Sequence, residues 1–252
     1  MDERNLAKHR GCTTLPFDHE QWRRGLPYRP GEIDYEQPVN QMIRLTPETS
    51  DFLYRQYTPL ETAYEPGTRP KLERHAAMAV CTARTQRDKA LALMEWACRK
   101  VTCLRGVTPD LVVHGGTEED FLERGFGVCN EVSRVFVTLC QVAGIAARMT
   151  FHWTEDGRFG HSLAEAHVED KWTLFDTEIN VSGFAVDGFQ ANCWELMTDR
   201  AAAKAFDELV TRRQLNLIGL AVEGRHYSDF FKVLGLCNHP IEAFPYKHRR
   251  PR

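Results

Sequence analysis

Cys129 stands where a glycine-rich approach, GFGV at 125–128, gives way to a helical pattern. A thiol is nucleophilic only as its thiolate, and a helix N-terminus favours that form because unpaired N–H groups and the macrodipole stabilise negative charge. A backbone N–H there could also face the oxyanion of an acyl intermediate. Gly125 and Gly127 add no side chain and would let a substrate approach closely. The alternative is a packed structural thiol, and Cys129 alone does not decide between the two.

A nucleophilic cysteine needs a base, and the base needs an orienting group. His161 opens a predicted strand and Asp176 closes the next one. If the hairpin turns at Glu169-Asp170, Asp176 lies diagonal to His161 on one face, about 7–8 Å away between Cα atoms and within side-chain reach. His167 lies on the same face but nearer the turn, two same-face positions beyond Leu163, the residue expected opposite Asp176. This register favours His161 over His167 as the base.

The order GVC, TLC, AGIAAR, HSLAEAHVEDKW and TLFDTE resembles the transglutaminase-like superfamily. In that superfamily a G-x-C helix precedes a GIPAR-type strand, an H-x-x-x-E strand with a Trp further along, and an Asp. The resemblance covers about residues 85–180 and implies a papain-like core in which Cys129, His161 and Asp176 form the catalytic triad. The sequence around TLC also resembles that of the peptide N-glycanase branch, but the zinc-binding Cys pairs of that branch are missing.

Two positions depart from the family pattern without removing a reacting group. Leu163 stands where the family usually has an aromatic residue, and Thr177 stands where Pro is common. Glu165 occupies the last position of the H-x-x-x-E pattern, and we expect it to support the fold.

The remaining candidate residues have simpler structural interpretations. We expect His167 to be structural or to lie in a cleft. Trp96 could supply an indole donor near the site, but a core position on its helix is favoured, as it is for Trp172. The spacing of Cys129, His161 and His167 matches no standard zinc pattern, so we predict no metal and no cofactor.

The hydrophobic periodicity predicts the elements that position these groups. Helices are predicted at 71–83, from Thr85 to about 101, at 117–123 with Thr117 as cap, from 129 to a Gly144 C′ residue, and at 195–213. The 129 helix is apolar over much of its circumference, which is typical of a helix at the centre of a domain. Strands are predicted at 145–153, 161–168 and 171–178. Helix first and then consecutive antiparallel strands predict an α+β fold, with the Cys helix packed on the sheet.

Three regions are predicted: an N-terminal extension at 1–70, a catalytic core at 71–194, and a helical and irregular C-terminal extension at 195–252. The first region is rich in proline, with one short helix expected at Thr46 and Pro47. Its aromatic content is too high for a disordered linker, so we expect it to pack on the core.

The composition excludes several classes of protein. The chain has 252 residues and a net charge of −3, too small to indicate a nucleic-acid partner. No apolar run approaches the ~18 residues of a membrane span, and the N-terminus has no apolar signal region. The eight cysteines include no CxxC pair, which favours reduced thiols and a cytoplasmic location.

These observations predict a cysteine enzyme that acts on amide or peptide bonds through a thioester. Hydrolysis by a peptidase or amidase is preferred, and a transglutaminase-type acyltransferase is the alternative. The third possibility is a non-catalytic binding module on the same fold. The expected partner is a peptide, a protein or a small amide, and no oligomeric state is predicted.

Overall fold

The computed structural model describes residues 42–56, 58–62, 64–103, 117–153, 160–184, 190–212, 233–237 and 246–249. Within these ranges an antiparallel six-stranded sheet has the order β1-β9-β5-β6-β7-β8. Its strands are β1 (Met42–Arg44), β9 (Val233–Cys237), β5 (Ala147–Trp153), β6 (Gly160–Val168), β7 (Lys171–Asp176) and β8 (Val181–Ser182).

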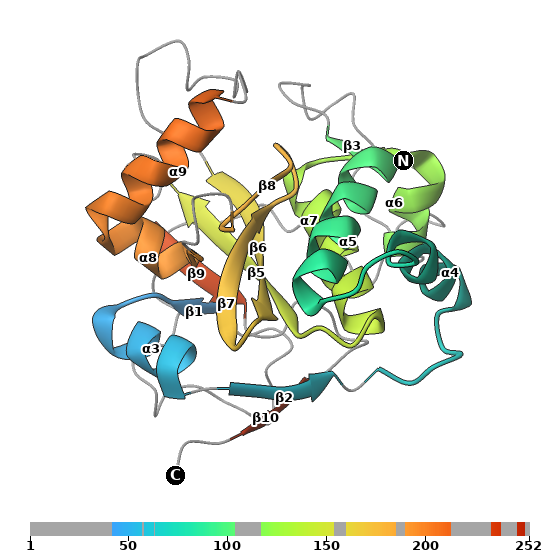
Figure 1. Ribbon diagram of the computed structural model, residues 1–252, viewed down its shortest axis with the longest axis horizontal. Helices are drawn as coiled ribbons and strands as arrows, with labels where there is room; N and C mark the ends of the chain where they lie inside the picture. Colours follow the sequence, from blue (N-terminus) through green and yellow to red (C-terminus); the bar gives the residue numbers. More distant parts are fainter. Residues whose placement is uncertain are drawn as a thin grey trace, which may run out of the picture.

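Helices lie on both sides of this sheet (Figure 1). One side carries α4 (Pro70–Ala79), α5 (Gln86–Lys100), α6 (Glu118–Arg124) and α7 (Cys129–Val142), and the other carries α8 (Cys193–Thr198) and α9 (Arg200–Arg212). The smaller elements are α3 (Pro47–Asp51), a π-helical turn (Phe52–Gln56), the pair β2 (Thr58–Thr62) and β10 (Tyr246–Arg249), and the parallel pair β3 (Thr102–Cys103) and β4 (Phe126–Gly127). The predicted α+β fold, with the Cys helix packed on an antiparallel sheet, is confirmed.

Alternation along β6 divides the apolar core between the two faces of the sheet. Ala164 and Ala166 belong to the core formed with α5 and α7, whereas Leu163 belongs to the core formed with α8 and α9. On the α7 side the Phe136 ring packs on Phe175, with 4.9 Å between centroids. Both faces of β6 are therefore covered, and α7 is buried at the centre as predicted.

The predicted turn at Glu169-Asp170 has the geometry that a two-residue hairpin requires. Both residues have positive φ angles, 54° and 61°, as in a type I′ turn, whose twist matches that of the flanking strands. Val168 pairs with Lys171, as expected from the sequence. The hairpin register that selected His161 is confirmed.

The helix ends predicted from local capping signals are confirmed. Thr85 and Thr117 cap α5 and α6 through their hydroxyl groups, and Gly144 follows α7 with a φ of 79°. The helical structure predicted at 195–213 is confirmed, with one interruption: α8 ends at Thr198, and the Asp199 side chain accepts from the N–H groups of residues 201 and 202 at the start of α9. The C-terminal extension at 195–252, predicted to be helical and irregular, also contributes β9, which lies between β1 and β5 in the sheet.

The described part of the N-terminal region contacts the core. β1 belongs to the main sheet, and the side chains of Leu45 and Leu53 are buried against residues of β6 and β7. Residues 1–41 lie outside the described residues, so the packing predicted for them stays a prediction.

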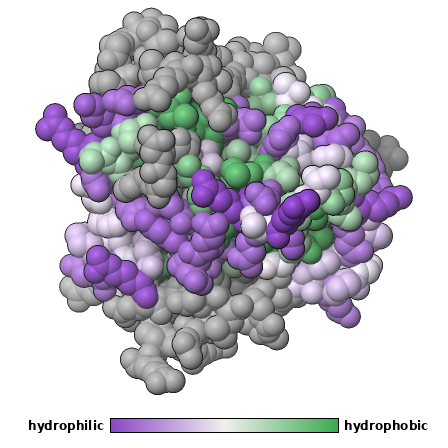
Figure 2. Space-filling view, in the orientation of Figure 1, coloured by the Kyte–Doolittle hydropathy of each residue, from purple (hydrophilic) through white to green (hydrophobic). Residues whose placement is uncertain are grey.

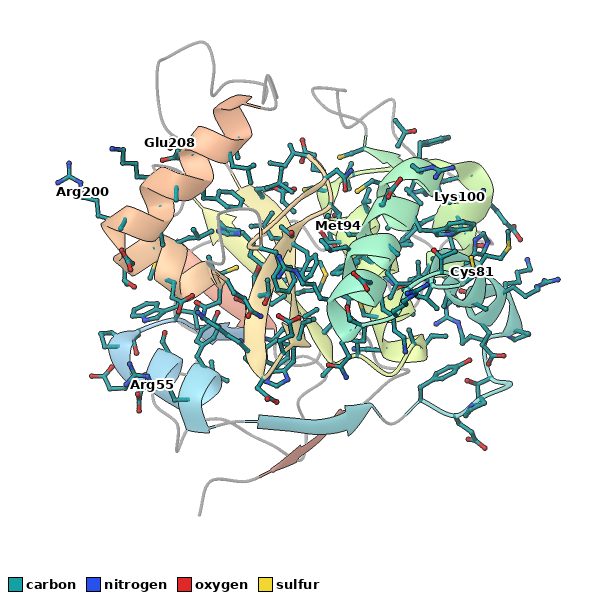
Figure 3. All side chains as sticks on the ribbon, viewed as in Figure 1. Arg55, Cys81, Met94, Lys100, Arg200 and Glu208 are labelled. Atoms are coloured by element: carbon teal, nitrogen blue, oxygen red, sulfur yellow. The ribbon has the colours of Figure 1, made fainter. Side chains whose placement is uncertain are left out.

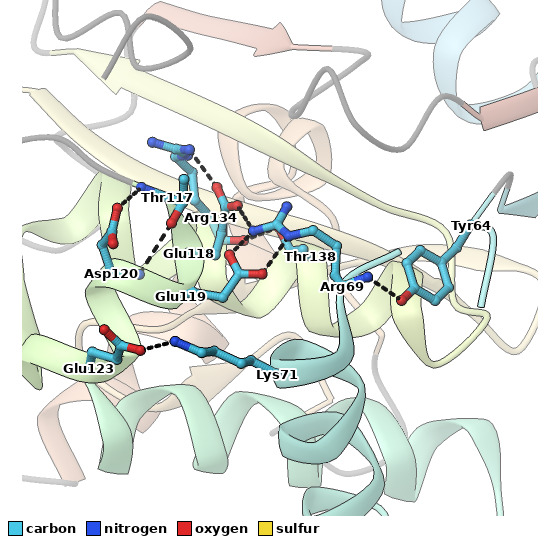
Figure 4. A network of polar contacts seen from close by, with 10 residues as sticks. All are labelled: Tyr64, Arg69, Lys71, Thr117, Glu118, Glu119, Asp120, Glu123, Arg134 and Thr138. Atoms are coloured by element: carbon cyan, nitrogen blue, oxygen red, sulfur yellow. Dashed lines mark hydrogen bonds and ion pairs between the residues drawn. The ribbon is translucent and has the colours of Figure 1, made fainter. Parts of the chain in front are cut away.

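Ion pairs connect the helices around α7 (Figure 4). The buried carboxylate of Glu118 binds Arg134 of α7 and also Arg69, which precedes α4, at 2.9 Å in the latter case. Arg69 additionally pairs with Glu119. These contacts fix α6 against α4 and α7.

The described surface is mainly hydrophilic on the face shown in Figure 2, with hydrophobic side chains visible near its centre. Among the described residues, no helix combines the length and apolarity needed to cross a membrane.

A buried ion pair crosses from β5 to β6. Arg148 and Glu165 are both fully buried, and the guanidinium Nε donates to Glu165 at 2.9 Å. The centroid of the Trp172 ring lies 3.7 Å from the guanidinium carbon of Arg148. Glu165 also accepts from the Tyr54 hydroxyl at 2.9 Å and from the Cys193 N–H at 2.8 Å. This carboxylate thus joins the N-terminal region, the sheet and α8, the fold-supporting role expected for it.

We expect Glu165→Gln to destabilise the protein by about 3–5 kcal/mol, because it leaves the Arg148 guanidinium buried without a counter-charge. Urea unfolding would measure this as a lowered midpoint. Glu123→Gln is the matched control, since the Glu123–Lys71 pair is more than half exposed and should contribute little. Equal stability of the two variants would contradict a structural role for Glu165.

Candidate active site

Cys129 is the first residue of α7, as the sequence predicts. The preceding N-cap residue is Val128, whose side chain has no oxygen to accept from the first-turn N–H groups. The Glu131 carboxylate instead accepts from the Val128 N–H at 3.1 Å and pairs with Arg124. The partly exposed thiol of Cys129 therefore lies at the positive end of a helix that has no N-cap side-chain acceptor.

The two glycines before Cys129 each have a structural reason within the protein. Gly125 ends α6 with a φ of 75°, a conformation that side chains disfavour. A Cβ atom on Gly127 would lie 2.9 Å from a carboxylate oxygen of Glu131. The need for glycine here follows from backbone conformation and from Glu131, a different reason from the substrate approach expected in the sequence analysis.

His161 and Asp176 meet at the same end of neighbouring strands. The His161 Nε2 lies 3.0 Å from Asp176 Oδ2, and Asp176 is fully buried. The other oxygen of Asp176 accepts from the backbone N–H groups of Glu178 at 2.9 Å and Ile179 at 3.4 Å. Because an ionised carboxylate only accepts, this contact assigns the ring proton to Nε2 and leaves Nδ1 for another partner.

The other side of the imidazole faces Cys129 and Glu178. The His161 Nδ1 lies 3.3 Å from Glu178 Oε2. The Cys129 Sγ, a His161 ring nitrogen and a Glu178 oxygen all lie within 4.8 Å of one another. The structure therefore brings the three predicted residues together and adds a fourth group, Glu178.

A buried hydroxyl group connects the Cys helix to the His and Asp strands. Ser133, one turn beyond Cys129, donates to the carbonyl of Ser162 at 3.2 Å, and its oxygen lies 3.0 Å from the Thr177 hydroxyl. Since a hydroxyl has a single donor, Thr177 is the donor in the second bond. Ser162 and Thr177 directly follow His161 and Asp176, so Ser133 fixes the thiol relative to both side chains.

Residues 74–177 match the transglutaminase-like superfamily. This segment is a transglutaminase-like core. It includes Cys129, His161 and Asp176, and it ends one residue before Glu178. No curated protein matches the chain.

Three solved structures are similar to part of this chain. A protein from Cytophaga hutchinsonii, provisionally assigned as a cysteine protease, is 21% identical with a TM-score of 0.38 over 48% of this chain and 40% of its own. A provisionally assigned protease from Parabacteroides distasonis is 8% identical, with a TM-score of 0.34 over 50% and 29%. A TGase is 15% identical, with a TM-score of 0.37 over 59% and 40%. The chain thus spans less than half the length of each of these proteins.

The titratable groups near the site in the transglutaminase-like core differ in the direction in which their pKa values are shifted. Burial lowers the pKa of His161, but the charge and hydrogen bond of Asp176, together with Cys129, outweigh it and raise the pKa well above 6.5. His152, opposite His161 on β5, has a pKa well below 6.5 because of burial and the neighbouring His161 charge. Burial, with the Asp176 charge, raises the pKa of Cys98 to about 12. His161 can therefore hold a proton at neutral pH while His152 stays neutral and Cys98 stays a thiol.

The other candidates from the sequence take structural places in the core. His167 packs edge-on against Trp172, with 5.3 Å between ring centroids. Trp96 donates to His75 at 3.1 Å and packs on the apolar core. Glu178 was missed, although its position two residues after Asp176 in the predicted 171–178 strand would have placed both carboxylates on one face.

We expect the His161 ring to titrate above pH 6.5 in the folded protein and to titrate lower in Asp176→Asn, which removes the largest favourable charge. Because the raised pKa means that folding strengthens proton binding, the stabilisation is full below pH about 6.5 and is lost as pH rises through the folded pKa. NMR titration of the histidine ring protons, with His161→Gln for assignment, would measure both values.

Asp170→Asn is the matched control, because asparagine tolerates the positive φ of this turn residue. It should leave the His161 titration unchanged. An equal shift in both variants would contradict a specific effect of Asp176.

Proposed function

We propose that this protein is a cysteine enzyme that cleaves amide or peptide bonds through a thioester on Cys129. The observation that carries the proposal is the position of His161, which contacts Asp176 at 3.0 Å on one side and lies beside the Cys129 sulfur on the other. The family match supports a cysteine enzyme at the level of the superfamily.

In the proposed reaction, Nδ1 of His161 takes the thiol proton and the sulfur attacks the carbonyl carbon. Negative charge then develops on the carbonyl oxygen, where N–H groups at the start of α7 can stabilise it. The imidazolium gives its proton to the leaving amine, and a thioester remains on Cys129. Asp176 holds the ring tautomer and stabilises its positive charge throughout.

The acceptor that resolves the thioester distinguishes two activities. We favour water, and therefore a peptidase or amidase, because water requires no second binding site. An amine acceptor would give transglutaminase-type acyl transfer, and the Glu178 carboxylate beside His161 is a group that could bind a protonated amine. A peptide, a protein or a small amide is the proposed substrate, and the free cysteines of the described residues suit a reducing, cytoplasmic location.

Trapping the acyl-enzyme would test the proposal directly. The full chain would be incubated with a mixed pool of peptides and amides, quenched in acid, and its Cys129 peptide searched for a thioester by mass spectrometry. Cys129→Ser would replace the thioester by a more stable ester or leave none. Absence of any adduct on Cys129, across pools that acylate a control cysteine protease, would favour the non-catalytic binding module.

We expect brief iodoacetamide treatment near neutral pH to modify Cys129 before Cys81, although Cys81 is the more exposed thiol and lies on the helical side of the molecule (Figure 3). The reason is that His161 can take the proton of Cys129, whereas accessibility alone favours Cys81. Peptide mass spectrometry over time would give both rates. Faster modification of Cys81 would contradict the assignment of Cys129 as nucleophile.

We expect His161→Ala to lower kcat by about 10²–10⁴-fold, the usual contribution of general acid–base catalysis. His167→Ala should have a much smaller effect, because that ring packs against Trp172. Until a substrate is known, the alkylation rate of Cys129 serves as the readout, with the Cys81 rate as internal control. A larger loss in His167→Ala than in His161→Ala would show that the wrong histidine was chosen.

A further inference from the structure

Cys129, His161 and Glu178 present one sulfur, one nitrogen and one oxygen donor to a common point. Their ligand atoms lie within 4.8 Å of one another, and each of the three residues is partly exposed. Nε2 of His161 is engaged by Asp176, so Nδ1, 3.3 Å from Glu178 Oε2, is the nitrogen that faces this point. We propose that these three residues form a site for Zn²⁺ that reversibly blocks the nucleophile.

The distances suit a tetrahedral ion. Ligands about 2.0–2.3 Å from zinc lie about 3.3–3.6 Å apart, and the Nδ1 to Oε2 separation is 3.3 Å. The Cys129 sulfur lies within 4.8 Å of a His161 ring nitrogen and of a Glu178 oxygen, and rotation about its Cα–Cβ bond is the motion that would adjust it to the third corner. Three protein ligands leave the fourth position to water, which is the arrangement of open zinc sites.

The surroundings of His161 also match those of a metal ligand. A ligating histidine usually donates its second ring N–H to a carboxylate, which fixes the ring and the tautomer. Asp176 provides that carboxylate, and its other oxygen is held by two backbone N–H groups. The contact that prepares His161 as a base therefore also prepares it as a ligand.

The charges balance without any oxidation or reduction. A thiolate and a carboxylate supply two negative charges for a divalent cation, and the neutral imidazole supplies a lone pair. The proton shared between the sulfur and Nδ1 leaves for solvent when the Zn–S and Zn–N bonds form. Binding itself does not depend on the proposed function, and only its inhibitory consequence does.

The spacing that excluded zinc in the sequence analysis concerned a different set of residues. His167, considered there as a third ligand, packs on Trp172. Glu178 takes its place because the chain turns after Asp176 and returns this carboxylate to the ring. Among the described residues, Cys129, His161 and Glu178 are the group of three potential metal ligands that the structure brings together.

The test uses the full chain, reduced and freed of metal by chelation. ZnCl₂ should slow iodoacetamide modification of Cys129 but not of the exposed Cys81, and a chelator should restore the rate. MgCl₂ at the same concentration should have no effect, because Mg²⁺ prefers oxygen ligands. Each variant is compared with its own zinc-free rate.

We expect Glu178→Gln to raise the half-protecting zinc concentration by at least about 10-fold, the lower end of the cost of losing even an outer partner of a metal ligand. Glu178→Asp should fall between the two and provides a second variant if the first does not fold. His167→Ala is the matched control and should bind zinc like the natural protein. Co²⁺ should give a sulfur-to-metal charge-transfer band that Cys129→Ser loses.

Two results would overturn the inference: zinc that does not protect Cys129, or equal protection in Glu178→Gln and in the natural protein. The outcome is separable from that of the proposed function. If the protein binds zinc at Cys129 but never forms a thioester, the metal site stands and the proposed enzymatic function fails. If it forms a thioester but zinc does not protect Cys129, the proposed function stands and the metal site fails.

Discussion

The hydroxyl group of Ser133 is the contact on which the arrangement of the site depends. It is fully buried and links α7 to the residues that follow His161 and Asp176. Catalysis of the proposed kind is sensitive to small displacements between nucleophile and base. Apolar packing of α7 on the sheet brings the helix to the right place, but apolar contacts are non-directional. One hydrogen bond to β6 and one to the turn that follows β7 add the direction that packing lacks.

Thr177 shows how this chain accommodates a departure from the pattern of the superfamily that its core resembles. The resemblance places proline at this position in many members, and proline could not donate the hydrogen bond that Thr177 makes to Ser133. The hydroxyl pair is thus a local solution of this sequence. Cys98 reinforces it, since its thiol donates to the Thr177 carbonyl at 2.9 Å. The same bond, together with burial, engages a second thiol near Asp176.

The start of α7 combines the proposed nucleophile with incomplete capping. Val128 cannot cap the helix through its side chain, and a polar N-cap typically contributes about 1 kcal/mol. Helix α7 is instead stabilised at its other end and along its length. Gly144 and Ile145 complete a Schellman motif with bonds to Gln141 and Cys140. The N-terminal end of α7 is therefore the end without a side-chain cap, and it is also the end that carries Cys129, the residue proposed to react.

Local patterns in the sequence were sufficient for much of the fold and for the proposed catalytic residues. Thr85 and Gly144 mark helix ends because capping acts within one turn, and the hairpin register follows from two turn residues. Contacts between distant segments leave no such pattern. The insertion of β9 beside β5, the Ser133–Thr177 bond and the three partners of Glu165 each depend on how separate elements pack. Glu178 is an intermediate case. The strand face on which its carboxylate lies could be predicted, but the turn that brings the carboxylate back to His161 could not.

The two-residue turn at Glu169-Asp170 has a consequence for how this protein can evolve. Side chains alternate between faces along a strand, so one inserted residue that shifted β7 against β6 would move Asp176 to the opposite face. Most surface hairpins tolerate changes in length, because loops carry few fixed contacts. Here the length of the turn is coupled to the pairing of His161 with Asp176, at the far end of both strands. Lineages that keep this site should therefore vary the composition of the turn and conserve its length.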